Sequence, residues 1–187
     1  MATNLFNKTI LAACGSDGLG HALQSEAVAV IYMNADINAL ITKTFRERCR
    51  EKPILIHFDL LKGLSGDKEA LRFVKRVVDP YGVVTTRSNI VRAAKSEGLF
   101  TMQRIFLIDT KSFKNSLDTI TENKPDAIEI MPAIAPTIVQ RYKERITIPV
   151  VLGGLIREEC QIDEAFACGA DAVSMSKSDL WNYKYSL

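Results

Sequence analysis

Eight short runs of apolar, mostly β-branched residues recur along the chain, and amphipathic stretches separate them. The runs are nearly continuous in hydrophobicity rather than alternating, which is typical of strands covered on both faces. They lie at Ile10–Cys14, Ala27–Met33, Pro53–Phe58, Gly82–Thr86, Phe100–Ile108, Ala127–Met131, Pro149–Gly153 and Ala172–Ser176. The stretches between them, such as 36–51 and 67–79, place apolar residues three or four positions apart, which indicates helices. Strands that alternate with helices predict parallel βαβ units.

Eight such units predict one α/β domain over residues 1–187, a short (β/α)8 barrel of the TIM type. The chain is short for such a barrel, and the shortfall lies at its two ends. Few residues follow Ser176, so we expect the last helix to be truncated, and the unit after the first strand is equally brief. An open doubly wound sheet is the rival fold, but it leaves two of the eight runs unexplained.

Composition and charge narrow the classes of function. The chain has 24 Lys and Arg against 22 Asp and Glu, so its net charge of +2 does not by itself indicate nucleic-acid binding. It has no long apolar run, and its first residues are too polar for a signal peptide, so we expect a cytoplasmic protein without a membrane partner. The cysteines at 14, 49, 160 and 168 lack CxxC spacing and nearby histidines, so we expect reduced thiols, no metal site and no cofactor.

The ends of the last two strands carry the most interpretable motif. In a barrel of this type, functional groups gather at the C-terminal ends of the strands. Glycines let backbone N–H groups approach an anion closely, and the loops after strands seven and eight form the usual phosphate cradle of the fold. We therefore expect a phosphate to contact Gly153, Gly154, Ser174 and Ser176, although Gly-Gly alone also fits a simple tight turn.

Other strand ends place further polar side chains at the predicted mouth. We expect ligand contacts from His57, Asp59, Lys62, Thr85, Arg87, Arg104, Asp109 and Glu129. Alternatives stay open for several of them. Asp59 and Lys62 also fit a catalytic acid–base pair or a surface ion pair, and Arg87 also fits a solvated loop cation. Arg104 and Glu129 also fit a purely structural pair, because a charge buried inside a barrel needs a partner.

One stretch, residues 43–52, concentrates positive charge. As a helix it would present Lys43, Arg46 and Arg50 on a single face. A solvated helix face is the simpler interpretation, and contact with the phosphates of an RNA is the sharper one.

Taken together, the strand-end motifs resemble those of the glycerol uptake operon antiterminator regulatory proteins. The matching segments occur in order over residues 10–183, and they are His57-Phe-Asp-Leu-Leu-Lys-Gly63, Thr85-Thr-Arg-Ser-Asn89, Gln103-Arg-Ile-Phe-Leu-Ile-Asp109, Asp126-Ala-Ile-Glu-Ile-Met-Pro132, Val151-Leu-Gly-Gly-Leu-Ile156, and Ala172-Val-Ser-Met-Ser176 with Leu180-Trp181. The resemblance implies a short TIM-type barrel, binding of glycerol 3-phosphate, control of transcription antitermination through a leader mRNA, and no enzymatic activity. The sequence departs from the family pattern after the first strand, where residues 14–18 are rich in glycine, and at Met131-Pro-Ala133, where Pro-Gly is expected.

Three functional hypotheses follow from these patterns. The first is a ligand-sensing regulator that binds glycerol 3-phosphate or a similar small phosphate. The second is a phosphosugar lyase, isomerase or synthase, in which Asp59, Lys62 or Glu129 performs acid–base chemistry on a ligand in the same phosphate cradle. The third is an RNA or protein adaptor that has lost its ligand. The residues do not fix the oligomeric state, and a homo-oligomer is compatible with them.

Overall fold

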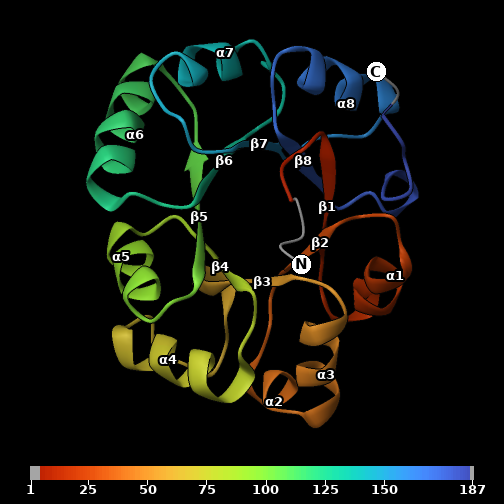
Figure 1. The fold of residues 1–187 in the computed structure, drawn as a ribbon, viewed down its shortest axis with the longest axis vertical. Coiled ribbons are helices and arrows are strands. Elements are labelled where there is room, and N and C mark those ends of the chain that lie inside the picture. The colour runs from red at the N-terminus through yellow and green to blue at the C-terminus, as the bar shows by residue number, and fades with distance from the viewer. Residues whose placement is uncertain (1–4, 186–187) are drawn as a thin grey trace.

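The computed structural model describes residues 5–185 and shows a closed barrel of eight parallel strands (Figure 1). The strands are β1 (Thr9–Cys14), β2 (Ala29–Tyr32), β3 (Ile54–His57), β4 (Gly82–Thr85), β5 (Phe100–Phe106), β6 (Ala127–Met131), β7 (Val150–Gly153) and β8 (Ala172–Met175). Each strand pairs with the next along the chain, and β8 closes the ring by pairing with β1. The predicted (β/α)8 fold is therefore confirmed, and an open sheet is excluded. Residues 1–4 and 186–187 of the predicted domain lie outside the described residues.

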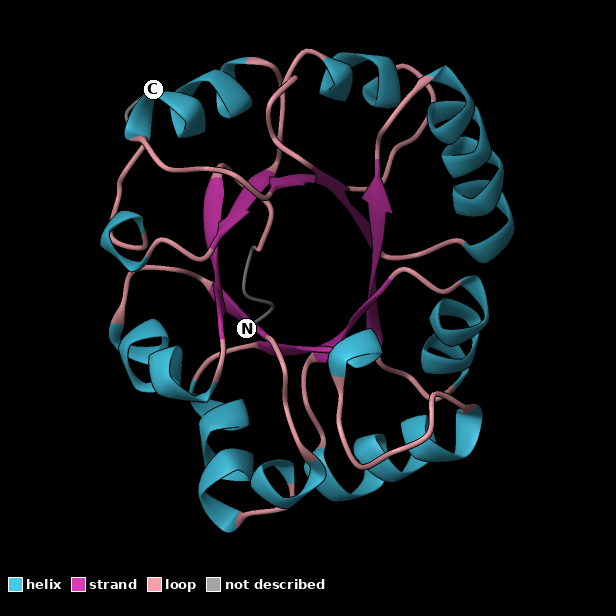
Figure 2. Cartoon of the chain, turned by 180° about the vertical axis from the view of Figure 1, so that it is seen from behind, coloured by secondary structure: helices cyan, strands magenta, loops and turns pink. Residues whose placement is uncertain are grey.

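Helices surround the barrel as an outer ring (Figure 2). They are α1 (Leu19–Gln24), α2 (Ile37–Leu40), α3 (Lys43–Glu51), α4 (Lys68–Phe73), α5 (Ser88–Ser96), α6 (Thr110–Asn123), α7 (Ile138–Lys143) and α8 (Glu159–Ala167). Single turns complete the ring, namely the 3-10 turns η1 (Ser16–Gly18), η2 (Phe58–Leu60) and η4 (Ser178–Leu180) and the π-helical turn η3 (Val74–Val78). In the described part of the chain only η4 follows β8, so the truncation of the last helix is confirmed. No helix there is long and apolar enough to span a bilayer.

The single helix predicted over 36–51 is wrong, because the chain breaks it into α2 and α3. Thr42 has an extended backbone, and its hydroxyl accepts a hydrogen bond from the backbone N–H of Phe45 at 3.2 Å. A threonine side chain that bonds the backbone in this way competes with helical bonding and favours a cap. The periodicity of apolar residues did not reveal this interruption.

The inside of the barrel consists of an apolar layer beneath a polar one. Inward positions alternate along each strand, and the lower ones, including Leu11, Leu55 and Met102, form one apolar cluster. Leu5 joins this cluster, and Phe6 packs against it and stacks on Phe100 with ring centroids 5.9 Å apart. Two residues beyond the apolar layer, toward the C-terminal ends of the strands, the same alternation points four buried polar side chains inward: His57, Arg104, Glu129 and Ser174. The apolar layer carries packing, and the polar layer lies under the mouth.

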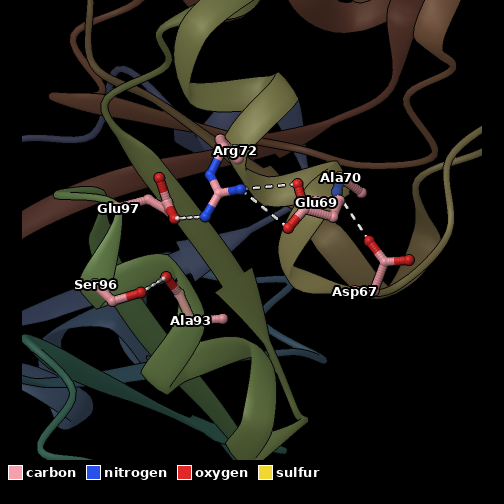
Figure 3. A network of polar contacts seen from close by, with 7 residues as sticks. All are labelled: Asp67, Glu69, Ala70, Arg72, Ala93, Ser96 and Glu97. Carbon is pink, nitrogen blue, oxygen red and sulfur yellow. Dashed lines mark hydrogen bonds and ion pairs between the residues drawn. The ribbon is translucent and has the colours of Figure 1, made fainter.

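A surface network ties two neighbouring helices of the outer ring together (Figure 3). Arg72 of α4 donates to both carboxylate oxygens of Glu69, at 2.9 and 3.0 Å, and its second terminal nitrogen lies 3.4 Å from Glu97 after α5. Asp67 caps α4 by accepting a hydrogen bond from the N–H of Ala70 at 2.9 Å. Exposed ion pairs of this kind contribute little to stability, so the network locates the two helices relative to one another without forming a site.

Candidate functional site

Three side chains of the polar layer form one buried network. The register places Arg104 of β5 beside Glu129 of β6, and Arg104 Nε donates to Glu129 Oε2 at 2.6 Å. Ser174 of β8 donates from Oγ to Glu129 Oε1 at 2.5 Å. The carboxylate is fully buried, and the Arg104 side chain is only 5% exposed. Removing two charges from water is costly, so this pair needs the tight contacts that it makes.

Gly153 makes room for this network. A Cβ at Gly153 would lie 2.1 Å from Ser174 Oγ and 3.0 Å from Glu129 Oε1. Gly153 was predicted to contact an anion. Its observed role is in packing, because a side chain at this position of β7 would overlap the Glu129–Ser174 contact.

Two buried nitrogens of the polar layer have no hydrogen-bond partner among the described residues, namely Arg104 Nη2 and His57 Nδ1. Buried polar atoms are almost always paired, so unpaired ones indicate a ligand or water position. Burial lowers the pKa of His57, and the charge of Arg104 lowers it further. A neutral imidazole and a charged guanidinium therefore lie in the interior, and each has one nitrogen that is free to form a hydrogen bond.

A cavity of about 320 Å³ lies at the C-terminal ends of β5 to β8 and β1. This volume is at the lower end of the range for small-molecule sites, which suits a ligand of few atoms. Its lining combines the polar layer with apolar rim residues: Ala13, Met33, Arg104, Phe106, Met131, Gly154, Leu155, Ile156, Arg157, Ser174, Met175 and Ser176. Arg104, Gly154, Ser174 and Ser176 were predicted as site residues, and the structure brings them together here.

The rim of the cavity offers donors to an anion. Gly154 and Leu155 have φ of +77° and +63°, so the chain turns sharply after β7. The backbone N–H groups of Gly154, Leu155 and Ser176 donate to no acceptor among the described residues. Arg157 also lines the cavity, and sequence reasoning missed it. Its place four residues after Gly153 was the available signal, because a cation on a predicted phosphate loop is a natural ligand.

On the β3–β4 side of the mouth, the predicted residues form a closed network instead. The Asp59 carboxylate accepts hydrogen bonds from the hydroxyls of Thr85 (2.5 Å) and Thr86 (2.8 Å) and from the Thr86 N–H (2.7 Å). It also accepts one from Arg87 Nε at 2.9 Å. Burial alone would raise the pKa of Asp59, but these four bonds together lower it. The loop before α4 covers the pair, since a Cβ at Gly66 would lie 2.1 Å from Arg87 Nη1.

Of the eight predicted mouth residues, only Arg104 is among those that line the cavity. Two of the others, Lys62 and Asp109, also lie outside the polar layer and the Asp59 network. Lys62 is exposed, and its backbone joins the segment after β3 to the segment after β2. Its N–H donates to the carbonyl of Ala35, and its carbonyl accepts from the N–H of Ile37. Asp109 is the N-cap of α6, where its carboxylate accepts a hydrogen bond from the Ser112 N–H at 2.7 Å. The bonds to the cap lower the pKa of Asp109.

The predicted cationic face lies on α3, on the outer ring. Lys43, Arg46 and Arg50 are exposed and line one shallow groove together with Glu47. Lys43 and Glu47 form an ion pair at 3.7 Å. Elsewhere, the four cysteines are all unpaired, and no cluster of three metal-ligating side chains occurs within residues 5–185.

Comparison with known proteins agrees with the motifs at the strand ends. The model of a family described as glycerol-3-phosphate responsive antiterminators matches residues 9–181. The chain belongs to this family. The resemblance that the strand ends predicted is thereby confirmed, and the family description supports a regulatory protein rather than an enzyme.

Individual proteins and solved structures are also similar to this chain. The uncharacterized protein YgcP of Escherichia coli (strain K12) is 31% identical over 177 residues, which cover 94% of this chain and 92% of that protein. The crystal structure of the glycerol uptake operon antiterminator regulatory protein from Listeria monocytogenes str. 4b F2365 has a TM-score of 0.88 and 29% identity, covering 95% of this chain and 97% of that one. A related protein from Thermotoga maritima MSB8 has a TM-score of 0.81 at 24% identity, over 95% and 99% of the two chains, and shows the shared fold.

Proposed function

We propose that this protein is a ligand-sensing regulator that binds glycerol 3-phosphate in the mouth cavity and controls transcription antitermination through a leader RNA. One observation carries the ligand proposal: the buried guanidinium of Arg104 has an unpaired nitrogen at a cavity whose rim presents unpaired backbone N–H groups. A ligand with hydroxyls at one end and a phosphate dianion at the other matches this arrangement. Its hydroxyls would lie near the buried Arg104, and its phosphate near the N–H groups of the rim. The family description supplies the name of such a ligand.

The arrangement suggests how the ligand is oriented. The phosphate meets the N–H groups of Gly154, Leu155 and Ser176 at the rim, with the Arg157 side chain beside it. Backbone N–H groups and an arginine are the usual partners of phosphate oxygens. The hydroxyls reach inward to Arg104, which lines the cavity and has an unpaired nitrogen. A polyol without phosphate would leave the rim donors unpaired and so would bind far more weakly.

The enzyme hypothesis receives less support from the same geometry. A general base at neutral pH needs a raised pKa and a free lone pair facing the substrate. Asp59 has a lowered pKa and is held by four donors, and Glu129 is held by Arg104 and Ser174. Lys62 is not among the lining residues of the cavity. We therefore expect no turnover of glycerol 3-phosphate or of common triose and pentose phosphates.

Thermal unfolding in the presence of three compounds tests the ligand. Glycerol 3-phosphate at 100 times its Kd should stabilise the protein by about 2.7 kcal/mol, whereas glycerol should have no effect and inorganic phosphate a weak one. Arg157→Gln should reduce the shift, because it removes a rim cation. Arg76→Gln is the matched control, since Arg76 is exposed on the outer ring. Equal shifts with glycerol and glycerol 3-phosphate would contradict the phosphate assignment.

The RNA part of the proposal rests on the cationic face of α3. Neutralising Lys43, Arg46 and Arg50 together with Gln should weaken binding to the leader RNA and reduce the slope of log K against log salt by about two to three. Glycerol 3-phosphate binding should persist, because α3 contributes no residue to the cavity. A variant with Gln at Arg76, Lys114 and Lys124, which are equally exposed, is the control. Unchanged RNA affinity at two salt concentrations would move the RNA site to another surface.

A further inference from the structure

The four most exposed large apolar side chains of the described residues lie at the mouth, one at the end of β5 and three in the loops that follow β5, β6 and β7. Phe106, Ile108, Ile134 and Leu155 are 55–88% exposed, whereas the other exposed side chains of this kind reach at most 41%. We call these four residues the apolar rim. Phe106 ends β5, and Ile108, Ile134 and Leu155 lie in the β5–α6, β6–α7 and β7–α8 loops. Backbone hydrogen bonds join these neighbouring segments, from Leu107 N–H to Met131 O at 2.9 Å and from Ala133 N–H to Gly154 O at 3.1 Å. Contiguous exposed apolar surface on a soluble domain marks an interaction site.

A groove lies beside the apolar rim. It has a volume of about 370 Å³ and runs between α6 and α7, which are neighbours in the outer ring (Figure 1). Ile108 and Ile134 line this α6–α7 groove and are themselves 88% and 68% exposed, so they project beside a hollow of similar chemistry. The rest of its apolar lining comes from Leu107, Phe113, Pro132, Ala135 and Ile138. Projections and a recess on the same face are what a surface needs to fit a copy of itself.

The groove also carries one charge of each sign. The Arg141 guanidinium lies 4.5 Å from the centre of the Phe113 ring and takes part in none of the ion pairs among the described residues. The Asp109 carboxylate caps α6 and likewise has no cationic partner there. In an interface with twofold symmetry, residue i of one copy meets residue j of the other, and j meets i. A single acid and a single base at one groove therefore provide two matched ion pairs across such an axis.

We propose that the apolar rim and the α6–α7 groove form the interface of a twofold homodimer, in which the isoleucines of each copy enter the groove of the other and Asp109 of each pairs with Arg141 of the other. A nucleic acid fits this face less well. Ile108 and Ile134 offer neither charge nor a stacking surface, and Asp109 repels phosphates. A second copy satisfies the apolar surface and both charges at once.

The dimer would also affect the mouth cavity. Phe106 and Leu155 belong to the apolar rim and line the cavity, so the second copy would cover its entrance. This consequence rests on the proposed function. It predicts that glycerol 3-phosphate dissociates more slowly at protein concentrations where the dimer forms than at concentrations where the chain is monomeric.

Analytical ultracentrifugation of the full chain without ligand tests the interface directly. The wild type should sediment as a dimer that dissociates on dilution, and Ile134→Asp should be monomeric. Ile41→Asp is the matched control, because Ile41 is an exposed isoleucine at the α2–α3 junction, and it should dimerise like the wild type. A wild type that is monomeric at every attainable concentration, or an Ile134→Asp variant that still dimerises, overturns the proposal. Because no ligand is present, failure of the ligand proposal would leave this result unaffected.

Charge reversal identifies the paired residues. Arg141→Glu should raise the dimer dissociation constant about tenfold or more, because two symmetric attractions become repulsions. Adding Asp109→Arg should restore much of the lost affinity, and circular dichroism of each variant monitors the α6 cap. If the double variant dimerises no better than Arg141→Glu alone, the proposed pairing is wrong.

Binding of leader RNA by Ile134→Asp distinguishes a second copy from another partner. If Ile134→Asp remains dimeric but loses leader RNA, the face serves a different partner and the proposal fails.

Discussion

Two carboxylate–arginine pairs of nearly the same chemistry lie in different halves of the barrel mouth. In the β3–β4 half, Asp59 bonds Arg87 Nε at 2.9 Å and the Thr85 hydroxyl at 2.5 Å. In the β5–β8 half, Glu129 bonds Arg104 Nε at 2.6 Å and the Ser174 hydroxyl at 2.5 Å. The surroundings differ. Asp59 receives two further bonds from Thr86, and Gly66 packs against Arg87, whereas Arg104 keeps an unpaired nitrogen at a cavity.

The difference shows that the kind of residue at a strand end does not by itself identify a binding site. In the first network four donors satisfy the Asp59 carboxylate, and the Arg87 side chain is 40% exposed, so its remaining donors can bond water. The Arg104–Glu129–Ser174 network retains an unused donor next to open space. We infer that the first network holds the loops of the mouth in place and that the second receives the ligand.

The largest expected effect is on the buried pair. Glu129→Gln leaves the Arg104 charge buried without its counterion, so the free energy of unfolding should fall by about 3–5 kcal/mol. Asp59→Asn should cost only about 1–2 kcal/mol, because the Arg87 side chain is 40% exposed and water can replace its partner. Urea unfolding of both variants gives the comparison. An equal or larger loss in Asp59→Asn would contradict the distinction between the halves.

A double variant then isolates the role in ligand binding. Replacing both members of a buried ion pair by apolar residues of similar size is often neutral for stability. The variant with Arg104→Met and Glu129→Leu should therefore unfold at a urea concentration close to that of the wild type, yet it should lose the stabilisation by glycerol 3-phosphate. Retention of that stabilisation would make the pair purely structural.

The two glycines after β7 should behave differently. Gly153→Ala forces a Cβ against Ser174 Oγ and should destabilise the protein by about 1–3 kcal/mol through overpacking. At Gly154 the nearest atom to a Cβ is 3.6 Å away, so an alanine there causes no clash. Gly154→Ala should therefore lower the free energy of unfolding by about 1 kcal/mol, because only the positive φ is unfavourable. Thermal unfolding of both variants measures the difference. A more severe effect of Gly154→Ala would show that backbone conformation outweighs the packing at Gly153.

Sequence reasoning captured the architecture and four of the twelve residues that line the cavity. The eight strands were predictable because strands buried on both faces are continuously apolar. Glu129 was expected as a partner for Arg104 because a charge buried in such a strand needs one. The sequence did not show that Thr86 adds two bonds to Asp59 or that the Gly66 loop packs on Arg87, since both depend on loop packing in space. Arg157 was missed because a single arginine in a polar loop has no pattern of its own.

The smallest expected effect is a pH dependence from His57. Its pKa in the folded protein lies below the ordinary value of 6.5, because burial and the charge of Arg104 disfavour the imidazolium. The unfolded chain takes up this proton near pH 6.5 while the folded chain does not, so stability is full above that pH and falls as the pH drops toward the folded-state pKa. The slope contributed by His57 should be at most about 1.4 kcal/mol per pH unit, and His57→Gln should lose this contribution. Urea unfolding between pH 7 and pH 5 tests this, and an unchanged slope in the variant would place the titration elsewhere.

Calorimetric titration of glycerol 3-phosphate into three proteins tests the central claim most directly. The wild type and Asp59→Asn should bind with similar affinity, because the β3–β4 network does not contact the ligand. The Arg104→Met, Glu129→Leu double variant should give no binding heat while remaining folded. Binding that survives in the double variant and is lost in Asp59→Asn would place the ligand in the other half of the mouth and contradict the assignment.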